Sequence, residues 1–389
     1  MDETRRIVLT YYLYRATLSE GFIYPVVTLF LLARDLTVAE VGLVNGVFFG
    51  AVVLAEIPTG YVGDRIGRRD SLVVSTLVIT AAILGFTVAE SLAGFVAVYA
   101  VWGVGLTLRS GSGSAWLYDT LDERLDTDEF ARISGRGTAA FLVASGAMAV
   151  AGSYVYQFDR ELPFFATAAV TASGALVLLT VPETDAYAEG ETPTLTLADV
   201  RETVTERFAA PPLRAFIPFT AVLLAVPEFV DLYVQPISVA VGVPEARLGY
   251  LYAAFMLVTG VASYFVDRVR AAVGICGWFR VAPPLLGLGL AATGLLPVLA
   301  IPAFVLLRAV KNVSYAFRGQ YLNDHLPSLG RATVLSTASM VYGLAFLLAR
   351  VAGGALADAV GARESVAVVG LTLAVVASGW WLVAPPVAE

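Results

Sequence analysis

The sequence predicts an all-α membrane protein whose twelve transmembrane helices form two pseudo-symmetric six-helix bundles. Hydrophobic residues make up 58% of the 389 residues and charged residues only 15%, whereas a soluble globular protein carries about 25% charged residues. Many apolar runs reach the roughly 20 residues that a helix needs to cross a bilayer core. One long polar stretch near the middle of the chain separates two sets of six such runs.

The apolar runs define the individual spans. The predicted spans cover residues 7–33, 39–62, 71–90, 93–120, 131–156, 162–181, 213–238, 246–266, 272–295, 298–320, 332–356 and 365–385. The first run is too long for the core of a signal peptide and no small-residue cleavage site follows it, so it is expected to be a membrane helix. The runs also far exceed the roughly 10 residues of a barrel strand, which excludes a transmembrane β-barrel.

The distribution of arginine predicts the orientation of these spans. Arginines concentrate at one set of helix ends and loops, whereas the opposite loops hold only Arg34, Arg160, Arg247 and Arg363. Because positively charged loops remain in the cytoplasm, both termini are expected to be cytoplasmic. The protein is expected to lie in the cell membrane and to act as a monomer.

Weak internal similarity supports two related halves. The halves are predicted at 1–182 and 213–389, joined by a cytoplasmic linker at 183–212. Thr196 and Asp199 could cap a short helix on the inner membrane surface, and the alternative is a solvated linker. Asp64-Arg65 after the second span matches Asp267-Arg268 after the eighth. Such repeats are typical of transporters.

The loop after the second span carries the most specific motif. It contains Gly60, Asp64, Arg65, Gly67, Arg68 and Arg69 in the pattern Gly-x-x-x-Asp-Arg-x-Gly-Arg-Arg. This pattern resembles the signature loop of the major facilitator superfamily, which implies a gating role for Asp64 and Arg68. Gly67 would allow a tight turn, and a charged latch could close one side of the protein. The alternative is that the arginines only fix the topology.

Three acidic residues are predicted partners of this gate. Glu56 lies in the second span on the approach to the loop, and Asp119 and Asp324 end the fourth and tenth spans. The two aspartates are expected to pair with arginines of the inner loops.

The fourth span holds a second resemblance. Arg109 and Gly113 match the Arg-x-x-x-Gly pattern of drug–proton antiporters in the same superfamily. The resemblance implies that Arg109 tunes a nearby acidic proton carrier. The fifth span contains Gly146 and Gly152 but lacks the Gly-Pro pair of those antiporters.

Charged residues inside the predicted spans mark a candidate cavity, because a charge in the bilayer is costly and usually faces the bundle interior. These residues are Arg15, Glu20, Arg109, Glu228, Asp231, Arg308 and Lys311. Arg15 and Glu20 are five positions apart and so do not share one helical face. Glu20 and Glu228 are the predicted proton carriers, and the alternative is a set of ion pairs that only fix helix packing.

The sequence therefore predicts a secondary active transporter that works by alternating access. The predicted partners are protons, the lipid bilayer and a small amphipathic or drug-like compound for export, and the alternatives are transport of an anionic metabolite or a receptor that does not transport. The net charge of −7 disfavours nucleic acid. The sequence contains no HExxH, Walker or GxSxG motif that would indicate an enzyme. It has a single cysteine, Cys276, and a single histidine, His325, so neither a metal site nor a cofactor is predicted.

Overall fold

The computed structural model describes residues 3–110, 112–124, 127–181, 196–326 and 331–387. All regular elements in these ranges are helices. They form two compact units. The first contains Met1–Phe30, Val47–Thr194 and Pro244–Met256, and the second contains Leu31–Gly46, Leu195–Val243 and Leu257–Glu389. The predicted division at a linker over 183–212 stays a prediction.

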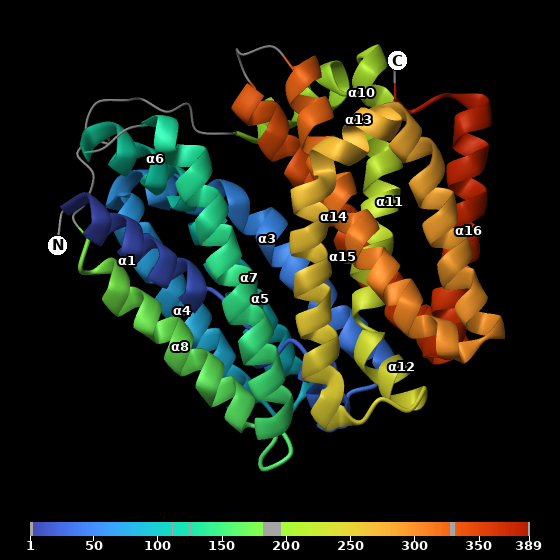
Figure 1. Ribbon diagram of the computed structural model, residues 1–389, viewed down its shortest axis with the longest axis horizontal. Helices are drawn as coiled ribbons and strands as arrows, with labels where there is room; N and C mark the ends of the chain where they lie inside the picture. Colours follow the sequence, from blue (N-terminus) through green and yellow to red (C-terminus); the bar gives the residue numbers. More distant parts are fainter. Residues whose placement is uncertain (1–2, 111, 125–126, 182–195, 327–330, 388–389) are drawn as a thin grey trace. The chain divides into compact units, whose positions relative to one another are not determined.

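The first unit is a bundle of long helices. Its helices are α1 (Glu3–Thr17), most of α3 (Val38–Ile66), α4 (Arg68–Val88), α5 (Leu92–Ser110), α6 (Ser112–Arg124), α7 (Phe130–Val155), α8 (Leu162–Leu178) and the beginning of α13 (Leu248–Leu295). Helix α4 packs against α5 and α8, and α1 packs against α7 and α8, as Figure 1 shows.

Small and aromatic residues hold the first unit together. The Ser75 hydroxyl donates to the Gly105 carbonyl at 2.6 Å, which brings α4 and α5 close together. The buried rings of Phe30 and Phe164 lie with their centroids 4.3 Å apart, and Phe86 stacks on Phe164. Because lipid offers no hydrophobic drive for helix association, such small-residue packing and interhelical hydrogen bonds stabilise the bundle.

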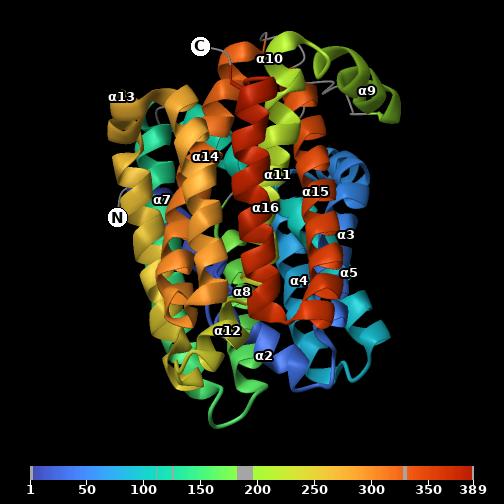
Figure 2. The ribbon, with the colours of Figure 1, turned by 90° about the vertical axis from the view of Figure 1, so that its right-hand side faces the viewer.

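The second unit is built around α11. Its helices are α9 (Leu197–Glu202), a π-helix at Thr203–Arg207, α10 (Pro211–Arg214), α11 (Phe216–Asp231), α12 (Val234–Ala240), the rest of α13, α14 (Ala300–His325), α15 (Arg331–Val360) and α16 (Ala362–Val383). Helix α11 packs against α14, α15 and α16 (Figure 2). The rings of Phe216, Phe279 and Tyr321 are buried among these helices.

The helices agree with the predicted spans, with informative differences. Nine helical segments of the described chain are long and apolar enough to cross a membrane. Predicted spans eight and nine both lie within the segment α13, where non-helical backbone at Gly274, with φ of 67°, forms a kink between two helices. The sixth span is the shorter apolar helix α8. The first span is divided into α1 and α2 (Val27–Leu32).

Two turns depend on glycine. Gly67, between α3 and α4, has φ of 87°, and Gly361, between α15 and α16, has φ of 97°. Glycine adopts this left-handed conformation without a Cβ clash. The predicted tight turn at Gly67 is confirmed.

Of the two alternatives for this stretch, the short capped helix α9 is present. The backbone amide of Thr196 donates to the Asp199 carboxylate at 2.7 Å, and the amide of Asp199 donates to the Thr196 hydroxyl at 3.2 Å. This reciprocal pair is a capping box, which satisfies two amides at the helix start. The hydroxyl and the backbone amide of Thr196 both donate hydrogen bonds to the Asp199 carboxylate, and these bonds lower the pKa of the Asp199 carboxyl below its usual value.

Candidate functional site

The first span breaks where Glu20 lies. Helix α1 ends at Thr17, and α2 begins only at Val27. Gly21 allows the break to lie close to α7, because a Cβ at this position would lie 2.7 Å from the Ser145 carbonyl oxygen. Pro25 has no amide proton to continue a helix. The amides of Ile23 and Tyr24 instead donate to the Glu20 carbonyl at 3.1 Å.

The break lines a cavity of 390 Å³ within the first unit, the first-unit cavity. Its lining residues are Tyr11, Tyr14, Arg15, Leu18, Glu20, Tyr24, Arg109, Ser110, Gly113, Ser134 and Phe141. They come from α1, the break, and helices α5, α6 and α7. Arg15 and Glu20 therefore share the cavity although they do not share one helical face, because the helix ends between them.

The charged side chains of the first-unit cavity form few hydrogen bonds and ion pairs. The Tyr24 hydroxyl donates to the Glu20 carboxylate at 2.9 Å. Within the described part of the chain, neither Arg15 nor Arg109 forms an ion pair, and the buried Nε of Arg15 has no hydrogen-bond partner. The Arg15 guanidinium lies 5.8 Å from the centre of the Phe141 ring. The cavity thus holds two cations and one anion without direct neutralisation.

The seventh span has a shorter interruption. Helix α11 ends at Asp231, and α12 begins at Val234. The amides of Leu232 and Tyr233 form tight turns between the two helices. Interrupted helices at corresponding positions of two halves are a general indication of transporter binding sites.

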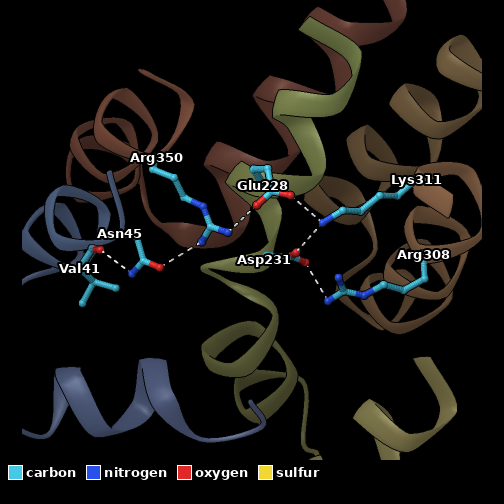
Figure 3. A network of polar contacts seen from close by, with 7 residues as sticks. All are labelled: Val41, Asn45, Glu228, Asp231, Arg308, Lys311 and Arg350. Atoms are coloured by element: carbon cyan, nitrogen blue, oxygen red, sulfur yellow. Dashed lines mark hydrogen bonds and ion pairs between the residues drawn. The ribbon is translucent and has the colours of Figure 1, made fainter. Parts of the chain in front are cut away.

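The charges beside this second break form the second-unit charge cluster, shown in Figure 3. Glu228 accepts from Lys311 at 2.7 Å and from Arg350 at 2.9 Å. Asp231 pairs with Arg308 at 2.7 Å and with Lys311 at 3.3 Å. Every carboxylate oxygen of the pair therefore faces a cation from α14 or α15.

Arg350 connects this cluster to the beginning of α3. Its Nη1 lies 3.5 Å from Oδ1 of Asn45, whose amide in turn donates to the Val41 carbonyl at 2.9 Å (Figure 3). A Cβ on Gly42 would lie 2.5 Å from the Arg350 carbonyl oxygen. The absence of a side chain at Gly42 thus allows α3 to approach α15 closely.

The gate-loop residues lie within the first unit. Nε of Arg68 is 2.5 Å from the Asp119 carboxylate, which joins the start of α4 to α6. Arg69 pairs with Asp70 at 2.9 Å and also donates to the Val181 carbonyl at 3.3 Å. Arg65 lies over the Tyr61 ring.

The other predicted gate residues are placed less specifically. Gly60 is exposed and Glu56 is half-buried in α3. Asp324 is exposed at the end of α14, and within the described residues it forms no ion pair. The Asp64 side chain lies outside those that the structure describes. The gating role of the loop stays a prediction.

The structure divides the seven predicted cavity residues between two sites. Arg15, Glu20 and Arg109 meet in the first-unit cavity, and Glu228, Asp231, Arg308 and Lys311 meet in the second-unit charge cluster. Sequence reasoning missed Arg350, although its charge inside the predicted span 332–356 was a signal. It also did not foresee Phe141 as a cavity residue. Within the described chain, no group of three or more His, Cys, Asp or Glu side chains could hold a metal ion.

The comparisons with known proteins agree with this architecture. The sequence profile of the Major Facilitator Superfamily matches residues 16–307. The chain belongs to the Major Facilitator Superfamily. The resemblance of the gate loop is thereby confirmed at the level of the superfamily, which is a group of transporters rather than enzymes.

One curated relative and two solved structures match most of the length of this superfamily member. The uncharacterized MFS-type transporter YxaM of Bacillus subtilis (strain 168) is 22% identical and is matched over 92% of this chain and 90% of its own length. The nucleoside transporter NupG superposes with a TM-score of 0.79 at 12% identity, covering 98% of this chain and 99% of that one. A bacterial homolog of the human lysosomal transporter Spinster gives a TM-score of 0.74 at 15% identity, covering 98% and 95% of the two chains. The predicted all-α transporter fold is confirmed.

Proposed function

We propose that this protein is a proton-coupled secondary transporter that moves a small amphipathic compound by alternating access. The observation that carries the proposal is Glu20, a 7% exposed carboxylate in the first-unit cavity that accepts a hydrogen bond from Tyr24 and pairs with no cation of the described chain. A carboxylate that lies inside a membrane transporter and is not neutralised by an ion pair is a candidate proton carrier. A proton bound there can be exchanged for a compound, or accompany it.

Glu228 is the weaker of the two predicted proton carriers. Both of its oxygens face cations, Lys311 at 2.7 Å and Arg350 at 2.9 Å. An opposite charge at this distance favours the ionised form. A proton at Glu228 would compete with two cations, whereas Glu20 contacts no cation among the described residues of the first unit.

Export is the direction that the Arg109 and Gly113 resemblance to drug–proton antiporters implies. The aromatic lining of the cavity, from Tyr11, Tyr14 and Phe141, suits an amphipathic compound. The Arg68–Asp119 ion pair supports a charged latch beside the gate loop. With both termini cytoplasmic, as the arginine distribution predicts, this latch would close the cytoplasmic side.

Proteoliposomes test the proposal directly. The purified protein is reconstituted around a pH-sensitive dye, a pH gradient is imposed, and a panel of amphipathic compounds is screened for coupled proton flux. For any compound that is moved, Glu20→Gln is expected to abolish accumulation driven by the pH gradient while exchange of labelled for unlabelled compound continues. One proton per cycle supplies about 2.3 kcal/mol per 100 mV of membrane potential.

The matched control is Glu90→Gln, which removes an exposed carboxylate of the same unit. It is expected to retain wild-type accumulation. Wild-type accumulation by Glu20→Gln would show that Glu20 does not carry the proton. A panel without any coupled flux would contradict transport itself and favour a receptor.

A further inference from the structure

The two units treat their buried charges differently. In the second-unit charge cluster, Arg308, Lys311 and Arg350 each contact a carboxylate within 3.3 Å. In the first-unit cavity, Arg15 and Arg109 contact no carboxylate of the described residues of the first unit within 4.0 Å, although Glu20 lines the same cavity. The cations of one unit are internally neutralised, and those of the other are not.

We infer that the first-unit cavity binds an organic anion, whose carboxylate or similar group is held by Arg15 and Arg109 and whose apolar body lies against the aromatic lining. This inference rests on the proposed function, since it names the class of compound that the transporter moves.

The cost of an unpaired buried cation supports the inference. A charge removed from water loses several kcal/mol of hydration unless a partner replaces it. The Nε of Arg15 is buried without a hydrogen-bond partner. A carboxylate accepts hydrogen bonds from a guanidinium through two oxygens, which makes arginine well suited to organic anions. An anionic ligand would supply the missing partner.

The charge and lining of the cavity agree with a monoanion. Two arginines and one glutamate give the lining a formal charge of +1. Tyr11 and Phe141 provide apolar surface, while the hydroxyls of Ser110 and Ser134 provide further polar contacts. The volume of 390 Å³ falls in the range of pockets that hold small molecules.

Matched pairs of acids and amides test the inference by binding alone. The full chain is purified in a neutral detergent, and thermal unfolding is followed with benzoate, 2-naphthoate and octanoate, and with benzamide, 2-naphthamide and octanamide. At least one carboxylate is expected to raise the unfolding temperature in a saturable way, and its amide is expected not to. Phosphatidylglycerol is added in a separate arm, because a lipid phosphate offers a similar charge.

Variants locate the site. Arg15→Gln and Arg109→Gln are each expected to raise the half-saturating concentration of the carboxylate by about ten- to a hundredfold, the range of a charge-assisted hydrogen bond. The matched control Arg132→Gln removes an exposed arginine that pairs with Glu129 and is expected to keep wild-type binding. Arg15→Lys and Arg109→Lys retain the charge and are expected to bind more tightly than the glutamine variants.

Several outcomes would overturn the inference. They are a lack of stabilisation by any of the carboxylates, equal stabilisation by acids and amides, protection by phosphatidylglycerol alone, and wild-type binding by both glutamine variants. The proposed function and the anion-binding inference fail in different ways. Proton-coupled flux of a neutral compound without carboxylate binding would support the transport function and contradict the anion-binding site. Carboxylate binding without any flux would support the anion-binding site and contradict the transport function.

Discussion

The stability of the second-unit charge cluster depends on Glu228 more than on any one of its cations. We consider Glu228→Gln, Arg350→Gln and the double variant. Glu228→Gln leaves Arg308, Lys311 and Arg350 facing the single carboxylate of Asp231. Arg350→Gln leaves two cations facing two carboxylates, and the double variant restores the wild-type excess of one cation.

The expected magnitudes follow from the contact distances. Nitrogen–oxygen separations of 2.7 Å to Lys311 and 2.9 Å to Arg350 place the charge centres of each pair roughly 4 Å apart. At an effective dielectric constant of about 20, each pair attracts by about 4 kcal/mol. Desolvation offsets much of this attraction, but removal of one partner from a buried pair costs about 3–5 kcal/mol. We expect this cost for Glu228→Gln and about 1.5–3 kcal/mol for Arg350→Gln.

Unfolding by dodecyl sulfate in mixed micelles measures these differences. The double variant is expected to lose less stability than the sum of the single variants, with a coupling energy of about 1.5–3 kcal/mol. Glu90→Gln, an exposed carboxylate outside the cluster, is the control and is expected to change stability by less than about 0.5 kcal/mol. Additive single costs, within about 0.5 kcal/mol, would refute a direct stabilising contact between Glu228 and Arg350.

Three further predictions concern the close helix contact, the gate and the linker helix. Gly42→Ala places a Cβ 2.5 Å from a carbonyl oxygen of α15 and is expected to cost about 1–3 kcal/mol, whereas Gly60→Ala on the same helix meets no atom within 4 Å and is the control in the same unfolding assay. Asp119→Asn removes the 2.5 Å ion pair with Arg68 and is expected to slow transport without loss of folded protein. The charge-swapped double variant Arg68→Asp/Asp119→Arg is expected to recover part of the transport rate. An unchanged rate in Asp119→Asn would argue against the latch. The pKa of Asp199 is lowered from 3.8 in the folded chain, so the stability that its carboxylate gives to α9 is fully present above pH 3.8 and is lost as the pH falls through the lowered value. Amide hydrogen exchange in α9, corrected for intrinsic rates, should therefore accelerate over that pH interval in the wild type. It should not do so in Asp199→Asn.

Much of the fold could be predicted from the order of residue types. Apolar runs determine which segments enter the membrane, because the bilayer selects helices by length and hydropathy. Turn chemistry is local as well, so the left-handed Gly67 and the capping box of Thr196 and Asp199 were both expected and are found. The gate-loop motif was sufficient to indicate the superfamily.

The interruptions of the helices were harder to predict from the sequence. Gly21 and Pro25 mark a break in the first span, but an apolar run of this length reads equally well as one helix. At the break, Gly21 packs closely against the Ser145 carbonyl oxygen of α7, a contact between segments distant in sequence. Glu20 and Arg15, which are not quite on one helical face, line the same cavity there.

The sequence by itself determined that ionised side chains lie inside membrane helices, and therefore that each must find a partner or a polar space. Only the tertiary structure decided which of these it is. Arg350 closes the pairing around Glu228 from a different helix, while Arg15 and Arg109 remain unpaired at the first-unit cavity within the described chain. The physical reason is that the energy of a buried charge depends on the atoms within a few ångströms of it, and those atoms come from helices that are far apart in the sequence.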